Sequence, residues 1–322
     1  MTWMLTGGAG YIGAHVLRAL QASGRQVVVV DDLSTGHAEV VPEGVPFVRA
    51  DVRDTDTLAR VMTEHGVVGV VHLAAKKAVG ESVEQPLRYY RENVDGVLAL
   101  AEAMVDAGVS RIVYSSSAAV YGAVDVDLVT EELPTQPVSP YGETKLIGEW
   151  VFRDAAVAHG FAVTALRYFN VAGAGSDDLG DSAVFNLIPM VMRAHARGDR
   201  PQIFGADYPT PDGTCIRDYI HVADLADAHV AAAAALETGA PGFTSYNIGR
   251  GEGSSVREVI ASVAAAIGTD LHAEVVGRRP GDPAVLVASA DRAAAELGWT
   301  ATRDLDAMTG SAWSAFRARS HG

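Results

Sequence analysis

Short apolar runs alternate with helical patterns along the first half of the chain, and this alternation limits the possible folds more than any other feature. Strands are expected at 2–6, 26–31, 45–50, 67–73, 110–115 and 161–167. Helices are expected between them at 11–23, 54–65, 83–107 and 141–159. Apolar strands separated by helices indicate a parallel sheet covered on both faces. Right-handed crossovers then make the predicted fold α/β, with a doubly wound parallel sheet.

The pattern becomes less regular after about residue 168. Shorter helices are expected at 183–197, 221–237, 254–268 and 304–317, with Gly- and Pro-containing loops between them. We therefore expect a Rossmann domain over 1–168 and a smaller mixed α/β substrate domain over 169–322, with 214–245 returning to the large domain.

Charge and composition limit the classes of partner that this protein can bind. The formal net charge of −15 argues against a nucleic acid or an anionic membrane, since both require a basic surface. A single cysteine, Cys215, leaves no internal disulfide. The sequence has no apolar stretch long enough to span a bilayer and no signal-peptide pattern, so we expect a cytoplasmic protein. No metal site is expected.

A glycine-rich stretch follows the first expected strand. The sequence TGGAGYIG (6–13) places Gly7, Gly10 and Gly13 in the strand–turn–helix context of a dinucleotide site. There, backbone amides approach a pyrophosphate at a helix N-terminus. Asp31 ends the second strand, where a carboxylate binds ribose hydroxyls, and 31–48 contains no Arg or Lys. An anion without nearby cations repels the 2′-phosphate of NADP, so the pattern predicts NAD.

Two further stretches fit this cofactor. Asp51 and Val52 follow the third strand, and HLAAKKAVG (72–80) ends the fourth strand at the carboxyl edge of the sheet, where ligands bind. His72 is interpreted as a packed residue at the end of a strand.

The catalytic hypothesis rests on the stretches YSSSAAVYG (114–122) and SPYGETK (139–145). Tyr141 and Lys145 are four residues apart, so on a helix they share one face. An ammonium beside a phenol favours the phenolate, which predicts a lowered pKa for Tyr141. A serine hydroxyl, this tyrosine and this lysine beside NAD form a set for oxidising an alcohol. The alternative is an ordinary exposed pair at a helix start.

These stretches, together with LRYFNVAGA and GTCIRDYIHVADLADAH, resemble the extended short-chain dehydrogenase/reductase superfamily and, within it, the UDP-glucose 4-epimerases. The resemblance runs from residue 1 to about 318. It implies that UDP-glucose and UDP-galactose are interconverted through a 4-keto sugar and transient NADH. It also implies a homodimer formed through helices 83–107 and 141–159.

The resemblance implies roles for individual residues. Ser117, Tyr141 and Lys145 are the implied catalytic residues. The implied NAD contacts are Gly7, Gly10, Tyr11, Ile12, Gly13, Asp31, Asp51, Val52, Leu73, Ala74, Lys77, Asn93, Tyr141, Lys145 and Tyr168. The implied UDP-sugar contacts are Ser117, Tyr141, Phe169, Asn170, Asn186, Leu187, Gln202, Phe204, Arg217, Arg279, Asp282 and Leu286. Arginines suit a diphosphate because their donors form a fork, but a surface ion pair is the alternative for Arg217 and Arg279. For Asn170 and Asn186 the alternative is loop capping.

Three departures from the family pattern affect the residues that the resemblance places near the sugar. Ala119 stands where many of these enzymes have a threonine, the stretch 173–189 is shortened, and Leu286 replaces a tyrosine. The resemblance implies that tyrosine at the last position excludes N-acetylhexosamines and that a small residue admits them, so leucine predicts secondary activity on them. The alternative is that Leu286 is a core residue of a strand.

Other functions remain open. A 4,6-dehydratase is disfavoured because Ser117-Ala118-Ala119 lacks the acidic residues that dehydration needs. A 4-epimerase for UDP-N-acetylglucosamine, UDP-pentoses or UDP-glucuronate is an alternative. From another class, a non-catalytic NAD-loaded regulatory protein is disfavoured because Ser117, Tyr141 and Lys145 are all present.

Overall fold

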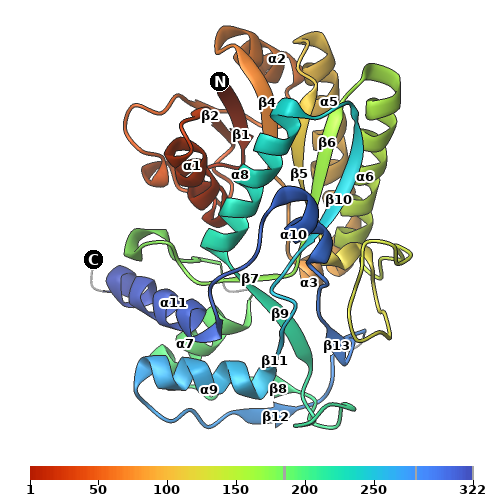
Figure 1. Cartoon of the computed structure of the whole chain (residues 1–322). Helices are drawn as coiled ribbons and strands as arrows, with labels where there is room; N and C mark the ends of the chain where they lie inside the picture. The colour runs from red at the N-terminus through yellow and green to blue at the C-terminus, as the bar shows by residue number, and fades with distance from the viewer. Residues whose placement is uncertain (184–185, 280, 321–322) are drawn as a thin grey trace.

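The computed structural model describes residues 1–183, 186–279 and 281–320. Its centre is a parallel sheet of seven strands in the order β10-β6-β5-β4-β1-β2-β3, which gives the predicted doubly wound α/β architecture (Figure 1). The strands are β1 (Thr2–Thr6), β2 (Gln26–Asp31), β3 (Phe47–Arg49), β4 (Val67–His72), β5 (Arg111–Ser117), β6 (Ala162–Tyr168) and β10 (Gly242–Ile248).

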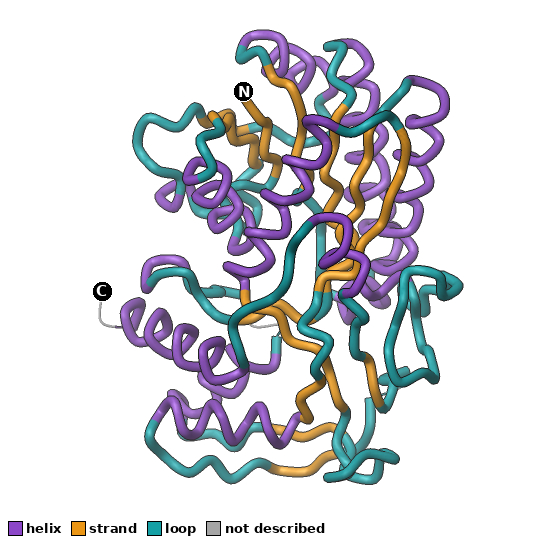
Figure 2. Tube along the Cα trace, in the orientation of Figure 1, coloured by secondary structure: helices purple, strands orange, loops and turns teal. Residues whose placement is uncertain are grey.

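Helices cover both faces of this sheet, as Figure 2 shows for the purple helices on either side of the orange strands. One face carries α1 (Tyr11–Ala22) and α8 (Val222–Thr238), and the other carries α2 (Thr55–Glu64), α5 (Asp95–Asp106) and α6 (Pro140–His159). Apolar strand residues therefore pack on both sides, which explains why their sequences are nearly continuous apolar runs.

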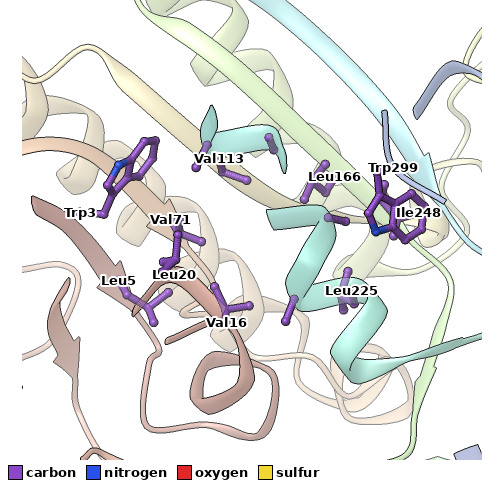
Figure 3. Close-up of a cluster of buried hydrophobic side chains, with 14 of the residues drawn as sticks. Trp3, Leu5, Val16, Leu20, Val71, Val113, Leu166, Leu225, Ile248 and Trp299 are labelled. Carbon is purple, nitrogen blue, oxygen red and sulfur yellow. The ribbon is translucent and has the colours of Figure 1, made fainter. Parts of the chain in front are cut away.

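The core on the α1 and α8 side is shown in Figure 3. Trp3 of β1 is fully buried, and a Cβ added at Gly69 of β4 would lie 2.8 Å from its ring. Glycine at position 69 therefore makes room for the indole beside β4. Truncating a buried tryptophan to alanine typically costs about 3–5 kcal/mol.

The second part of the chain forms small sheets and further helices below the large sheet (Figure 1). A small sheet contains β7 (Asn170–Ala172), β9 (Ile216–His221), β11 (Gly253–Ser255) and β13 (Val285–Leu286), and β8 (Gln202–Phe204) pairs with β12 (Glu274–Val276). The helices here are α7 (Leu187–Arg197), α9 (Val256–Ile267) and α11 (Leu305–Ser320), while α10 (Asp291–Leu297) lies near β10. Residues 184–185 of the helix expected at 183–197 lie outside the described residues.

The prediction of one continuous helix over 83–107 is wrong. The segment forms α3 (Val79–Glu84), α4 (Pro86–Tyr89), a π-helical turn (Tyr90–Val94) and then α5. Gln85 has φ −130° and ψ 56°, because a residue before proline is disfavoured in the helical region. The break places Pro86 in the first turn of α4, where its missing N–H costs nothing.

Among the residues that the structure describes, no helix is both long and apolar enough to cross a membrane.

Candidate active site

A cavity of about 610 Å³ opens at the carboxyl edge of the large sheet and extends to the small sheet. Residues from the ends of β1, β2, β4, β5 and β6 line one part, and residues of β7, β9 and β13 line the other. In parallel α/β sheets this edge is where ligands bind. Over residues 1–183, 186–279 and 281–320, no group of three or more His, Cys, Asp or Glu side chains could hold a metal ion.

All fifteen residues predicted to contact NAD line this cavity. They are Gly7, Gly10, Tyr11, Ile12, Gly13, Asp31, Asp51, Val52, Leu73, Ala74, Lys77, Asn93, Tyr141, Lys145 and Tyr168. They are spread over residues 7–168, and the sheet brings them together.

The glycine turn leaves backbone donors free at the start of α1. Gly7 has φ +73°, and a Cβ at Gly13 would lie 2.1 Å from the Gly7 carbonyl oxygen, so both positions require glycine. Gly10 caps α1 without a side-chain hydrogen bond. The first amides of a helix have no intrahelical partner, so this turn fits the pyrophosphate of a dinucleotide.

Asp31 is fixed in the position expected for a ribose ligand. Its two carboxylate oxygens accept hydrogen bonds from Ala9 N at 3.0 Å and Leu33 N at 2.8 Å. Burial raises the pKa of this carboxyl. Each oxygen keeps a further lone pair, so Asp31 can still accept from ribose hydroxyls.

Helix α6 brings Tyr141 to Ser117. Ser139 caps the helix, accepting a hydrogen bond from Gly142 N at 3.2 Å, and Pro140 occupies its first turn. A Cβ at Gly142 would lie 2.6 Å from the Ala119 carbonyl oxygen, so glycine lets the helix approach the end of β5. The Tyr141 hydroxyl is hydrogen-bonded with the Ser117 side chain.

The predicted lowering of the Tyr141 pKa is wrong for the protein alone. Burial raises this pKa, and the hydrogen bond with Ser117 opposes the rise. Lys145 lies 6.0 Å from the centroid of the Tyr141 ring, and its Nζ donates to the Ser115 carbonyl at 2.8 Å. Burial lowers the pKa of Lys145 to about 8. Desolvation of the phenolate therefore outweighs the interaction with Ser117 that favours the charged form.

A buried ion pair beneath the cavity supports these residues. Arg167 of β6 donates to both carboxylate oxygens of Glu149 on α6, at 2.8 and 2.6 Å. The same carboxylate accepts a hydrogen bond from Ser116 at 2.5 Å, next to Ser117. Sequence analysis missed this link, because only burial distinguishes it from a surface pair.

His72 is packed, in agreement with its interpretation from the sequence. Its Nδ1 is hydrogen-bonded with Thr6 Oγ1 at 2.7 Å, and its ring stacks on Tyr114. Burial lowers the pKa of His72 to about 3, so the imidazole is neutral.

The predicted substrate residues divide into two groups. Ser117, Tyr141, Phe169, Asn170, Asn186, Arg217 and Leu286 line the cavity. Leu187, Gln202, Phe204, Arg279 and Asp282 are not among its lining residues. Leu187 packs in a core of the second part, and Gln202 is exposed.

Three of the residues in the second group still connect to the cavity. The Arg279 guanidinium lies 4.4 Å from the centroid of the Phe204 ring and pairs with Asp282 at 3.2 Å. Asp282 also pairs with Arg217 at 3.6 Å, and Arg217 lies opposite Leu286 in the register of β9 and β13. Arg217 and Arg279 therefore both form ion pairs, which is the alternative that the sequence left open for them.

Asp218 is a cavity residue that sequence analysis did not single out. Its carboxylate accepts hydrogen bonds from the backbone nitrogens of Arg250, Gly251 and Ala288 at 2.8, 3.0 and 3.2 Å. Burial raises the pKa of Asp218 to about 6. It ties β9 to the segment that contains β13, and its position next to Arg217 was the only available signal.

Comparisons with known proteins agree with this site. The model of the NAD dependent epimerase/dehydratase family matches residues 3–249. The chain is 48% identical to a UDP-glucose 4-epimerase of Azospirillum brasilense over 97% of this chain and 90% of the relative.

Two solved structures have nearly the same fold. The UDP-glucose-4-epimerase from Stenotrophomonas maltophila, with bound NAD and formylated UDP-arabinopyranose, has a TM-score of 0.96 and 43% identity, over 100% of this chain and 99% of that one. The Bifidobacterium longum UDP-glucose 4-epimerase, in complex with NAD+ and UDP, has a TM-score of 0.93 and 38% identity, over 100% of both chains.

Proposed function

The chain belongs to the NAD dependent epimerase/dehydratase family and, within it, to the UDP-glucose 4-epimerases, and from this premise we propose that it interconverts UDP-glucose and UDP-galactose with NAD as cofactor. One observation carries the proposal. A single cavity joins the glycine turn and Asp31 to Ser117 and Tyr141 and then to Arg217.

We propose that Tyr141 moves the proton of the sugar's 4-hydroxyl. When bound, NAD accepts the C4 hydrogen with its electron pair and later returns it to the opposite face of the 4-keto sugar. The reaction needs one group that both takes and returns a proton, and we assign that role to the Tyr141 hydroxyl because it lines the cavity together with Ser117 and Lys145. Ser117 holds the substrate oxygen. Lys145, whose pKa lies at about 8, keeps most of its positive charge near neutral pH and supports the site from Ser115.

The substrate end is proposed to hold the UDP diphosphate through arginine. Arg217 lines the cavity and Arg279 is linked to it through Asp282. An arginine fork pairs well with phosphate oxygens, so Arg217 and Arg279 would exchange part of their ion pairing with Asp282 for the diphosphate. Asn170 and Asn186 line the same region as candidate hydrogen-bonding partners.

The domain division at residue 168 stays a proposal. The predicted return of 214–245 to the large domain is supported by β10, which pairs with β6 in the large sheet, and by α8, which packs in the same core as α1. Strand β9, within the segment predicted to return, belongs instead to the small sheet.

We also propose a homodimer through α3 to α6. These elements expose large apolar side chains, including Leu87, which is 77% exposed, and Val157, which is 88% exposed, together with Val83, Leu98, Val105 and Trp150. Pairing two copies would cover these side chains. Light scattering tests it: a mass near that of one 33.7 kDa chain at micromolar concentration would contradict the dimer. The cytoplasmic location stays a prediction.

The function is tested by turnover of purified protein with UDP-glucose and UDP-galactose, and then with UDP-N-acetylhexosamines, UDP-pentoses and UDP-uronates. We expect the first pair to react in both directions without added NAD. Turnover of a pentose or uronate alone would reject the proposed substrate. Leu286, which lines the cavity, favours UDP-N-acetylglucosamine as a secondary substrate.

A further inference from the structure

Lys76 joins two loops that lie on different strands of the sheet. It follows β4, and its Nζ donates a hydrogen bond at 3.1 Å to the hydroxyl of Ser34, which follows β2. In the sheet, β1 lies between β4 and β2. The lysine side chain therefore passes across the carboxyl end of β1, where the glycine turn begins. Lys76, Ser34 and the glycine turn line the same cavity.

The backbone and the ammonium of Lys76 are both held in place. Asn93 accepts from Lys76 N at 2.8 Å and donates to Lys76 O at 3.0 Å. Glu92, the preceding residue of the π-helical turn, lies 3.4 Å from the Lys76 ammonium. Because these contacts order the side chain beforehand, little further entropy is lost when it closes on Ser34.

The Ser34 loop is ordered as well. Ser34 N donates to Asp32 Oδ1 at 2.8 Å, and Leu33 has the positive φ of 61°, stabilised by its hydrogen bond to Asp31. A non-glycine residue holds this conformation only where its surroundings enforce it. The serine hydroxyl is therefore presented to Lys76 by a fixed loop.

The lysines of the chain are concentrated at this site. There are three, Lys76, Lys77 and Lys145, and all three line the cavity. Lys77 is exposed, whereas the Lys76 side chain is only 15% exposed. The contacts of Lys76 with Ser34 and Glu92 account for its lower exposure.

We propose that Lys76 and Ser34 form a clasp across the dinucleotide groove, which must open before NAD can leave. The clasp rests on the proposed function, because it acts on the NAD that this function requires. The pyrophosphate of a dinucleotide rests at the glycine turn after β1 in folds of this kind. A bond that passes across this turn slows the exit of the cofactor without taking part in the chemistry.

The test compares NAD release from wild type, Lys76→Met, Ser34→Ala, the double variant and the control Arg60→Met. Arg60 is an exposed cation on α2 that pairs with Glu64, so its loss matches the charge change at Lys76. Each NAD-loaded protein is dialysed, and the NAD remaining is assayed after denaturation. We expect release to be roughly 10- to 150-fold faster in both clasp variants, the usual range for losing one hydrogen bond to a charged group. The double variant should release NAD no faster than the faster single variant.

The outcomes separate the clasp from simpler roles. Release at the Arg60→Met rate in both variants overturns the clasp. Faster release in Lys76→Met alone, with Ser34→Ala unchanged, makes Lys76 an attracting charge and also overturns it. If the rate of NAD release in the double variant rises by the product of the two single effects, Lys76 and Ser34 act as independent contacts, and the clasp is rejected as well. A wild-type protein that binds no NAD rejects the proposed function itself.

Chemical modification gives a second readout of the clasp. With NAD bound, an amine-reactive reagent followed by mass spectrometry should modify Lys76 more slowly in wild type than in Ser34→Ala. Equal rates would contradict the clasp.

Discussion

The two ends of the cavity are built from different kinds of structure. The cofactor end lies on the carboxyl ends of strands in one continuous parallel sheet, and backbone amides fix Asp31 there. The substrate end lies on strands of two to six residues, and ion pairs among Arg217, Arg279 and Asp282 connect it. We therefore expect the cofactor end to be more rigid than the substrate end.

This difference suits the proposed reaction. NAD is neither consumed nor produced over a full cycle, so a rigid site loses nothing by keeping it. The 4-keto sugar must present its other face before the hydrogen returns, so its surroundings must allow movement. Side-chain ion pairs can exchange partners during that movement, whereas backbone ladders cannot.

The largest expected effect is at the junction of the two ends. Tyr141→Phe removes the proton acceptor but keeps the ring, so activity should fall about 100- to 10,000-fold. NAD content and UDP-sugar binding should stay close to wild type. Activity within about threefold of wild type would reject the role of Tyr141 in proton transfer.

A smaller effect is expected at the substrate end alone. Leu286→Tyr should remove most of the activity on UDP-N-acetylglucosamine, because the larger ring fills the space beside Arg217. Side-chain size in a pocket is worth about 1–3 kcal/mol, so the ratio of the two activities should change roughly 10- to 200-fold. Turnover of UDP-glucose with each variant is the reference, and an unchanged ratio would show that Leu286 does not control access.

Arg217→Ala should weaken binding at the substrate end of the cavity and leave binding at the cofactor end unchanged. Loss of a charged hydrogen-bonding group costs about 1.5–3 kcal/mol, which should raise KM for UDP-sugars while NAD content is retained. The exposed Arg257 on α9 gives a matched control, Arg257→Ala. If Arg217→Ala released NAD as readily as UDP-sugar, the two ends would not be independent.

The smallest effect concerns stability below the cofactor end. Burial lowers the pKa of His229 to about 4, while its ring nitrogens bond Ser115 Oγ and the Leu225 carbonyl. A lowered pKa means that the unfolded state binds the proton more strongly. The stability from this group is therefore complete above about pH 6.5 and is lost as pH falls toward 4.

Chemical denaturation at several pH values measures this loss. Between about pH 7 and 5, wild type should lose roughly 2 kcal/mol more than His229→Gln. Asp218 acts in the opposite sense, because its pKa is raised to about 6 and its contribution falls as pH rises. Identical pH slopes for the two proteins would show that His229 is not held neutral by the fold.

The sequence predicted the large sheet closely because its signals are contiguous. Strands 2–6 and 26–31 were predicted at their observed boundaries, since burial on both faces requires unbroken apolar runs. Gly7, Gly10, Gly13, Asp31, Asp51 and Val52 follow from strand ends and glycines, which are local features as well, whereas most of the other predicted cofactor residues came from the resemblance.

Other features depend on contacts between distant segments. The pKa of Tyr141 depends on burial, which no spacing reveals. Asp218 binds the backbone of residues 32, 33 and 70 positions away, so its role has no local pattern. Resemblance, rather than local pattern, brought Arg279 and Phe204 into the predicted site.

The π-helical turn at Tyr90–Val94 also bears on how this site can change over evolution. A π turn holds one residue more than an α turn, and each residue rotates a helix by about 100°. Deleting one residue here would let α4 and α5 merge into an uninterrupted helix. Glu92 and Asn93, which hold Lys76, would then face another direction. Substitutions in this turn change the side chains at this part of the cavity one at a time. Deleting a single residue would instead reorient all of them in one step.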